Sequence, residues 1–201
     1  MKILETRTAP NPRRVRIFLA EKGITVPFED HDLSSLKTPE FTALNSFQRV
    51  PVLLLDDGTA IAESIAICRY FEALHPEPAL FGRTPKEQGL VEMWNRRAEI
   101  SFMMPVAQAF RHLHPSMAKL EVPQVAVWGE ANKPRALEAL AKFEEALGQS
   151  RYIAGDAFSV ADITLLVAID FMRPARIERP ASFVHLARWL EDVKARPSSK
   201  A

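Results

Sequence analysis

The sequence has one cysteine, Cys68, among 201 residues. A single cysteine excludes an internal disulfide, a Cys-x-x-Cys redox pair and a thiolate-rich metal site. An excess of one charge is also missing, because 26 Lys and Arg stand against 25 Asp and Glu. A nearly neutral chain has no long-range field to attract nucleic acid or an anionic membrane surface. We therefore expect no nucleic-acid partner.

Long apolar runs are missing as well. The first seven residues, MKILETR, already carry charges and lack the apolar stretch of a signal peptide. No run approaches the roughly 18 apolar residues of a membrane-spanning helix. These absences predict no membrane association and a cytoplasmic location. With 47% apolar residues the chain can still bury a full core.

The first 76 residues alternate between strand-like and helical patterns. Gly23 ends the first helical segment, and Asp57-Gly58 is a strong hairpin turn. The predicted strands cover residues 2–6, 26–31, 52–55 and 59–62, and the predicted helices cover 11–22, 39–44 and 64–74. This order is typical of a small mixed α/β sheet.

The pattern changes after His75. Pro76, Pro78, Gly82 and Pro85 lie within ten residues, and no strand-like alternation follows them. We expect a first domain over residues 1–76, a linker over 77–84 and an all-helical domain over 85–201. The predicted helices of this second domain cover residues 85–114, 123–148, 160–173 and 183–196, and Pro105 should kink or split the first of them.

A helix-start signature stands at residues 158–163. Ser159 and Asp162 have the spacing of a capping box, and Phe158 with Ile163 forms a hydrophobic staple. We interpret this signature as structural.

Two features of the first domain indicate a peptide-shaped ligand. Pro51 interrupts an apolar strand-like run, and a proline there marks an edge, a first strand position or a cis bond. An ordinary trans strand start would be the usual explanation on its own. Downstream, Glu63-Ser64 begins a helix, where a hydroxyl and unpaired backbone amides can receive a carboxylate.

Four segments together resemble the cytosolic glutathione S-transferases, in particular their bacterial theta-like and nu-like members. The segments are residues 11–24, Val50-Pro51-Val52-Leu53, residues 63–67 and residues 158–163. The resemblance covers nearly the whole chain. It implies a thioredoxin-like, glutathione-binding first domain, an electrophile pocket in the helical domain and a cis Val50-Pro51 bond. It also implies glutathione as cosubstrate without a metal, a homodimer and a role in detoxification.

The resemblance implies a separate binding residue for each group of glutathione. Ser64 would bind the γ-glutamyl carboxylate and Glu63 the ammonium group. The Val50 backbone, freed by Pro51, would pair with the cysteinyl unit like an added strand. Either Arg49 or Lys37 would hold the glycine carboxylate.

The group that activates the thiol departs from the family pattern. The theta-type serine position falls on Ala9, which cannot donate a hydrogen bond. A free cysteinyl thiol titrates near pH 8.5, so a donor is needed to stabilise the thiolate at neutral pH. Asn11 resembles the Asn of nu-type members and is the first candidate, and Thr8 is the second. The arginines of residues 13–16 would add a positive field.

For the electrophile pocket the sequence offers a set of candidate residues without separate roles. The candidate residues, most of which we expect to be core, are Trp94, Phe102, Met103, Met104 and Phe110, with Arg97 or Arg111 at the edge. His112 and His114 are two residues apart, which does not place them on one helix face, and we expect no metal site. Cys68 lies in an apolar helix and is expected to be a core residue.

Three functions remain open from the sequence. The first is conjugation of the glutathione thiolate to small hydrophobic electrophiles. The second is glutathione-dependent disulfide or peroxide reduction, which needs no protein nucleophile. The third is a non-catalytic glutathione-binding or regulatory protein, for which Ala9 is the main argument.

Overall fold

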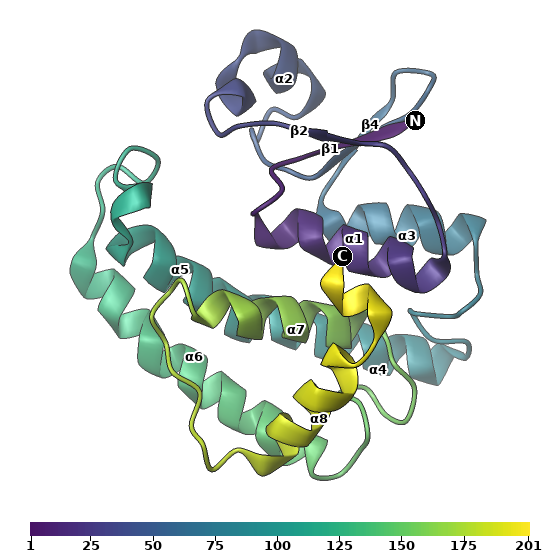
Figure 1. Cartoon of the computed structure of the whole chain (residues 1–201), viewed down its shortest axis with the longest axis vertical. Helices are drawn as coiled ribbons and strands as arrows, with labels where there is room; N and C mark the ends of the chain where they lie inside the picture. The colour runs from purple at the N-terminus through teal and green to yellow at the C-terminus, as the bar shows by residue number, and fades with distance from the viewer. The chain divides into compact units, whose positions relative to one another are not determined.

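The computed structural model describes all 201 residues, which form two compact units. The first unit comprises Met1–Leu80 together with Pro197–Ala201, and the second comprises Phe81–Arg196. Figure 1 shows a mixed sheet with helices in the first unit and helices alone in the second. The α/β plus all-α fold class predicted from the sequence is confirmed.

The sheet of the first unit has the strand order β2-β1-β3-β4. β1 is parallel to β2, and β3 is antiparallel to both of its neighbours. The strands are β1 (Lys2–Glu5), β2 (Phe28–Asp30), β3 (Val52–Leu54) and β4 (Ala60–Ala62). A parallel pair needs a crossover between its strands, and α1 (Pro10–Lys22) supplies it. β2 is shorter than predicted and exposed, as befits an edge strand.

Both faces of this sheet are covered, because its strand side chains alternate. Leu4 and Val52 pack with Leu36 and Phe41 on one face, against η1 (Ser35–Lys37) and α2 (Pro39–Leu44). Ile3 and its partners therefore point to the other face. That face is covered by α1 and by α3 (Ser64–Leu74) (Figure 1). The chain reverses after α1 at Gly23, whose φ of 65° is the left-handed conformation that glycine adopts easily.

The end of the chain belongs to the first unit. The 3₁₀ turn η4 (Pro197–Lys200) packs on α1, and Figure 1 shows the C-terminus beside that helix. Arg13 donates from Nη2 to the Ser199 carbonyl at 3.0 Å, and the Ser198 hydroxyl donates to the Glu21 carboxylate. Ser198 and Ser199 are both buried.

The second unit is a set of packed helices. Its helices are α4 (Pro85–Arg96), the π-helical segment η2 (Arg97–Met103), α5 (Met104–Leu113), α6 (Ala126–Leu147), α7 (Val160–Met172) and α8 (Val184–Lys194), with a 3₁₀ turn η3 (Pro115–Met117). The single helix predicted over residues 85–114 is thus divided. Pro105 cannot donate to the preceding turn, and the widened turns of η2 come directly before it.

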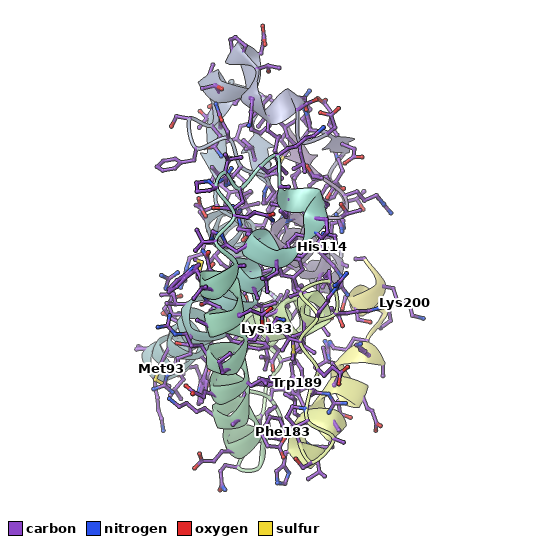
Figure 2. The ribbon with its side chains drawn as sticks, turned by 90° about the vertical axis from the view of Figure 1, so that its left-hand side faces the viewer. Met93, His114, Lys133, Phe183, Trp189 and Lys200 are labelled. Atoms are coloured by element: carbon purple, nitrogen blue, oxygen red, sulfur yellow. The ribbon has the colours of Figure 1, made fainter.

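α7 is the central helix of this unit and is buried over most of its length. The predicted capping box between Ser159 and Asp162 is present at its start. Asp162 also accepts hydrogen bonds from the Ile153 amide at 3.0 Å and from the Trp189 indole at 2.8 Å. Figure 2 shows Trp189, which is fully buried, within the helical unit. The helix start therefore also joins α8 to α7.

A helix that spans a lipid bilayer must be both long and apolar. None of the helices combines the length and the apolar character that a crossing needs.

Candidate functional site

The backbone of Val50 is the first component of the site. The Val50–Pro51 peptide bond is cis, as the family resemblance implied. β3 begins two residues later, where Val52 lies opposite Leu4 of β1 and Ala62 of β4. Neither the amide nor the carbonyl of Val50 has a hydrogen-bond partner within the protein. A donor and an acceptor thus remain unused at the end of the sheet.

The start of α3 is the second component. β4 ends at Ala62, which lies opposite Val52, so Val50 and Ser64 each stand two residues along the chain from this paired position. The first hydrogen bond of the helix runs from the Ile67 amide to the Glu63 carbonyl at 3.0 Å. The three amides before Ile67 therefore have no acceptor in the helix. Glu63, at the N-cap position, makes no capping hydrogen bond.

The Ser64 side chain adds to this set of unused donors. Ser64 is 4% exposed, and its hydroxyl has no hydrogen-bond partner within the protein. Free amides, the positive end of the helix dipole and a hydroxyl together form a site for a carboxylate. Glu63 is exposed next to it and carries the opposite charge.

Glu63 adopts an uncommon backbone conformation. Its φ is 71° and its ψ is 119°, whereas residues with a Cβ rarely have positive φ. Such conformations persist where the surrounding structure determines them, often beside functional sites. Here the conformation turns the chain from β4 directly into α3.

The loop before Val50 is held by a residue that the sequence analysis missed. Asn45 is 7% exposed and donates from Nδ2 to the Arg49 carbonyl at 2.9 Å. Its Oδ1 accepts the Phe47 amide at 3.1 Å. Asn45 thereby fixes the backbone that leads into Val50. The only signal in the sequence is a polar residue that ends a short helix shortly before Pro51.

The two candidates for the glycine carboxylate lie on the surface around this loop. Arg49 is exposed and donates only to the carbonyl of its neighbour, Gln48, at 3.3 Å. Lys37 is exposed at the end of η1, and the adjacent Leu36 packs in the same hydrophobic cluster as Val50. Both cations therefore remain candidates.

The start of α1 is the third component. Ala9 is its N-cap residue and offers no capping side chain. Pro10 and Pro12 have no N–H group, so Asn11 carries the only backbone N–H among the first three residues of the helix. The Asn11 Oδ1 atom is buried without a partner. Asn11 is therefore not the helix cap, and both its amide groups are available.

Thr8 lies in the turn before α1 and is exposed. No hydrogen bond fixes its hydroxyl within the protein, so it stays the second candidate for thiol contact.

A buried ion pair holds the loop between β1 and α1. The carboxylate of Glu5, which is 1% exposed, pairs with the Arg16 guanidinium. Arg16 also donates from Nη2 to the Arg7 carbonyl at 3.0 Å. On the other side the Arg7 amide donates to Asp30 Oδ1 at 2.8 Å. Glu5 was not among the residues predicted for the site, although a charged residue inside a buried strand is an unusual feature.

The candidate pocket residues of the helical unit have mixed environments. Phe102 is fully buried and Met103 nearly so, while Met104 is half exposed. The guanidinium of Arg97 stacks on the Trp94 ring at 4.6 Å, and that of Arg111 pairs with Glu121 at 3.1 Å. Both arginines thus have partners within their own unit.

Cys68 is a core residue, as predicted. It is completely buried, and burial raises the pKa of its thiol to about 12. It is therefore neutral and inert at physiological pH.

Comparison with known proteins gives a consistent result over both units. Residues 8–74 match the family model described as "Glutathione S-transferase, N-terminal domain", and residues 106–197 match "Glutathione S-transferase, C-terminal domain". The chain is 40% identical over 205 residues to Glutathione S-transferase 2 of Saccharomyces cerevisiae, and the match covers all of this chain and 88% of the yeast protein.

Two solved structures are similar to the whole chain. A glutathione S-transferase domain-containing protein of Marinobacter aquaeolei VT8 is 41% identical with a TM-score of 0.95, covering 99% of this chain and 100% of the other. Gtt2 from Saccharomyces cerevisiae is 40% identical with a TM-score of 0.94, covering 100% of this chain and 99% of the other.

Proposed function

The chain belongs to the glutathione S-transferase family, and from this premise we propose that it transfers the glutathione thiolate to small hydrophobic electrophiles. The observation that carries the proposal is the pair of neighbouring, unused hydrogen-bonding sites at Val50 and Ser64. One is strand-like and suits a peptide unit. The other suits a carboxylate. Glutathione carries both groups.

In this proposal each part of glutathione has its own partner. The γ-glutamyl carboxylate binds the Ser64 hydroxyl and the free amides of α3, and the Glu63 carboxylate binds the ammonium group. The Val50 amide and carbonyl pair with the cysteinyl unit, while Pro51 contributes no competing donor. Arg49 or Lys37 neutralises the glycine carboxylate.

Asn11 is proposed as the main contact of the thiolate. Its backbone N–H and its Nδ2 group are donors at the positive end of α1. Both stabilise an anion relative to a neutral thiol, so they lower the thiol pKa. Thr8 is the alternative donor. Because both donors are neutral amide groups, the activation is expected to be modest.

A second function, glutathione-dependent disulfide or peroxide reduction, is favoured by one observation. Ala9 stands at the start of α1, where it offers no hydroxyl. Attack of a glutathione thiolate on a disulfide requires an accessible thiolate and no protein nucleophile. The assays below separate this function from conjugation.

The quaternary structure belongs to the same proposal. Phe47, two residues after Asn45, is 78% exposed, more than any other aromatic side chain. We propose that the protein acts as a homodimer in the cytoplasm and that this ring is covered in the dimer.

Binding is tested first, by calorimetric titration with glutathione. Ser64→Ala should raise the dissociation constant for glutathione by about tenfold or more, because a hydrogen bond to a charged group is lost. Ser182→Ala, an exposed serine of the helical unit, is the matched control and should leave binding unchanged. If the wild-type protein neither binds glutathione nor gains thermal stability from it, both enzymatic proposals are wrong.

Chemistry is tested by comparing conjugation of an aryl halide with glutathione-coupled disulfide reduction. Activity in the second assay alone would establish the reductase in place of the transferase. Asn11→Ala should shift the pH profile of kcat/KM to higher pH. Asn11→Asp, which has the same shape but adds a negative charge, should shift it further. Identical profiles in all three proteins would remove Asn11 from this role.

A further inference from the structure

The segment η4 is attached to α1 at two points, one near each end of the helix. Arg13 of the first turn donates from Nη2 to the Ser199 carbonyl at 3.0 Å, and Glu21 of the last turn accepts the Ser198 hydroxyl. The two residues of α1 are about two helical turns apart, which is about 12 Å along the helix axis. η4 therefore lies along α1 and connects the beginning of the helix to its end.

Both points of attachment are sheltered from water. Ser198 is 6% exposed and Ser199 is 9% exposed, whereas the flanking Pro197 and Lys200 are exposed. Each hydrogen bond has one charged partner, a guanidinium or a carboxylate, and such bonds are stronger than those between neutral groups. Breaking either of them would leave a buried polar group without its partner, which is costly. η4 is thus held firmly on the helix.

The start of α1 has few means of its own to hold its first turn. Ala9 stands at the N-cap position and makes no capping hydrogen bond, and the first turn contains no acidic side chain to interact with the helix dipole. Pro10 and Pro12 favour a helical φ but bring no N–H group. Helix starts without a cap fray more readily. The first turn therefore depends on contacts from outside the helix, and Arg13 supplies one.

Asn11 lies in the same turn as Arg13. In the proposed function its backbone N–H and its Nδ2 group contact the thiolate, and its Oδ1 atom is buried. A hydrogen bond weakens steeply when its distance and angle depart from the preferred values. Binding groups must be held to within about 0.5 Å to keep such a contact. Fraying of the first turn would therefore weaken the contact with the sulfur.

We propose that Arg13 is a positioning residue for the glutathione thiolate, because its bond to η4 fixes the first turn of α1 and so keeps Asn11 in contact with the sulfur. Ser198 has the same role through its bond to Glu21. Neither side chain touches glutathione. This role rests on the proposed function, since it supports the contact that Asn11 makes there.

Arg13 could also act through its charge alone. A guanidinium stabilises a nearby thiolate without any contact to η4, as Arg14 and Arg16 of the same helix would. Ser198→Ala separates the two effects, because it breaks the attachment of η4 to Glu21 and changes no charge. If η4 fixes the helix, Ser198→Ala acts in the same direction as Arg13→Gln. If only charge matters, Ser198→Ala has no effect.

The main measurement is the pH profile of kcat/KM for glutathione conjugation. A hydrogen bond to a charged group corresponds to roughly 1–2 units of pKa, so weakening it should move the profile by about 0.5 pH unit to higher pH in both Arg13→Gln and Ser198→Ala. Ser150→Ala is the matched control, because the Ser150 hydroxyl donates to the Tyr152 carbonyl at 2.6 Å in the helical unit. The control should lose stability with an unchanged profile. A wild-type profile in Ser198→Ala would overturn the proposal.

Hydrogen exchange measures the fixing of α1 without any activity. Amides in the first two turns of α1 should exchange about tenfold faster in Arg13→Gln and Ser198→Ala than in the wild type, and those of α7 should be unchanged. Unchanged exchange in α1 would also overturn the proposal. If Asn11→Ala shifts the pH profile while Arg13→Gln and Ser198→Ala do not, the proposed function stands and only the positioning role is wrong. If the wild type does not bind glutathione, the proposed function is wrong and the positioning role with it.

Discussion

Replacement of Asp162 by alanine should strongly destabilise the helical unit. The carboxylate accepts hydrogen bonds from three buried N–H groups, those of Ile153, Ser159 and the Trp189 indole, over 2.8 to 3.0 Å. Each buried donor left without an acceptor costs about 1–3 kcal/mol. Removal of a buried carboxylate also returns some desolvation energy. We therefore expect a loss of about 4 kcal/mol, near the middle of the range for breaking a buried charged contact.

The assay is urea unfolding, followed by far-UV circular dichroism and by tryptophan fluorescence. Two probes are needed because the two units can unfold separately. In a thermal scan the same loss corresponds to roughly 8–16 °C for a chain of this size.

Two matched variants should lose less unfolding free energy than Asp162→Ala. Asp162→Asn keeps one acceptor oxygen but turns a donor toward the Ser159 amide, so about 2 kcal/mol should be lost. Trp189→Phe removes one donor and leaves the carboxylate with its other partners, so about 1 kcal/mol should be lost. Destabilisation of less than 1 kcal/mol in Asp162→Ala, or equal destabilisation in the alanine and asparagine variants, would refute the reasoning.

The pH dependence provides a further check at the same residue. Burial raises the pKa of Asp162 in the folded state despite its hydrogen bonds. The unfolded chain therefore releases this proton at lower pH than the folded chain, and the wild type loses stability as the pH rises above about 4. The asparagine variant lacks this effect, so its deficit should be smaller at pH 7 than at pH 4. An unchanged or larger deficit at pH 7 would contradict the raised pKa.

Three further predictions concern the first unit. Glu5→Gln leaves Arg16 without its buried ionic partner and should lower the unfolding free energy by about 3 kcal/mol; a loss below 1 kcal/mol would mean that the pair does not hold the loop. Because burial raises the pKa of Cys68 to about 12, stability should fall between about pH 9 and 12 by up to about 1.4 kcal/mol per pH unit, and Cys68→Ala should lack this slope in parallel urea titrations. Phe47→Ser should weaken the proposed dimer in sedimentation equilibrium without lowering the melting temperature of the monomer, and an unchanged dissociation constant would remove this ring from the interface.

The elements of the first unit follow closely from local sequence signals. α2 and α3 have the predicted bounds, because prolines, a cap residue and apolar spacing mark their ends. The π-helical turns before Pro105 were not predicted, since the sequence indicates that a proline disturbs a helix but not how the helix absorbs it.

Some residues of the candidate site can likewise be predicted from the sequence, and others cannot. Ser64 and Pro51 are visible in the sequence because of their positions in a strand and at a helix start. The roles of Asn45 and Glu5 cannot be predicted from the sequence, since they depend on contacts with backbone and side chains that only the fold brings together.

The packing of η4 on α1 determines when the first unit can complete its packing during synthesis of the chain. The surface of α1 that η4 covers is made of residues translated about 180 positions earlier, and at cellular rates that interval is roughly 10–35 s. From the synthesis of residue 74 until that of η4, the first unit has its sheet and helices but lacks part of its packing. We expect the nascent chain to reach its full resistance to proteolysis only after residue 200 has emerged, although the first unit is the earlier one to be made.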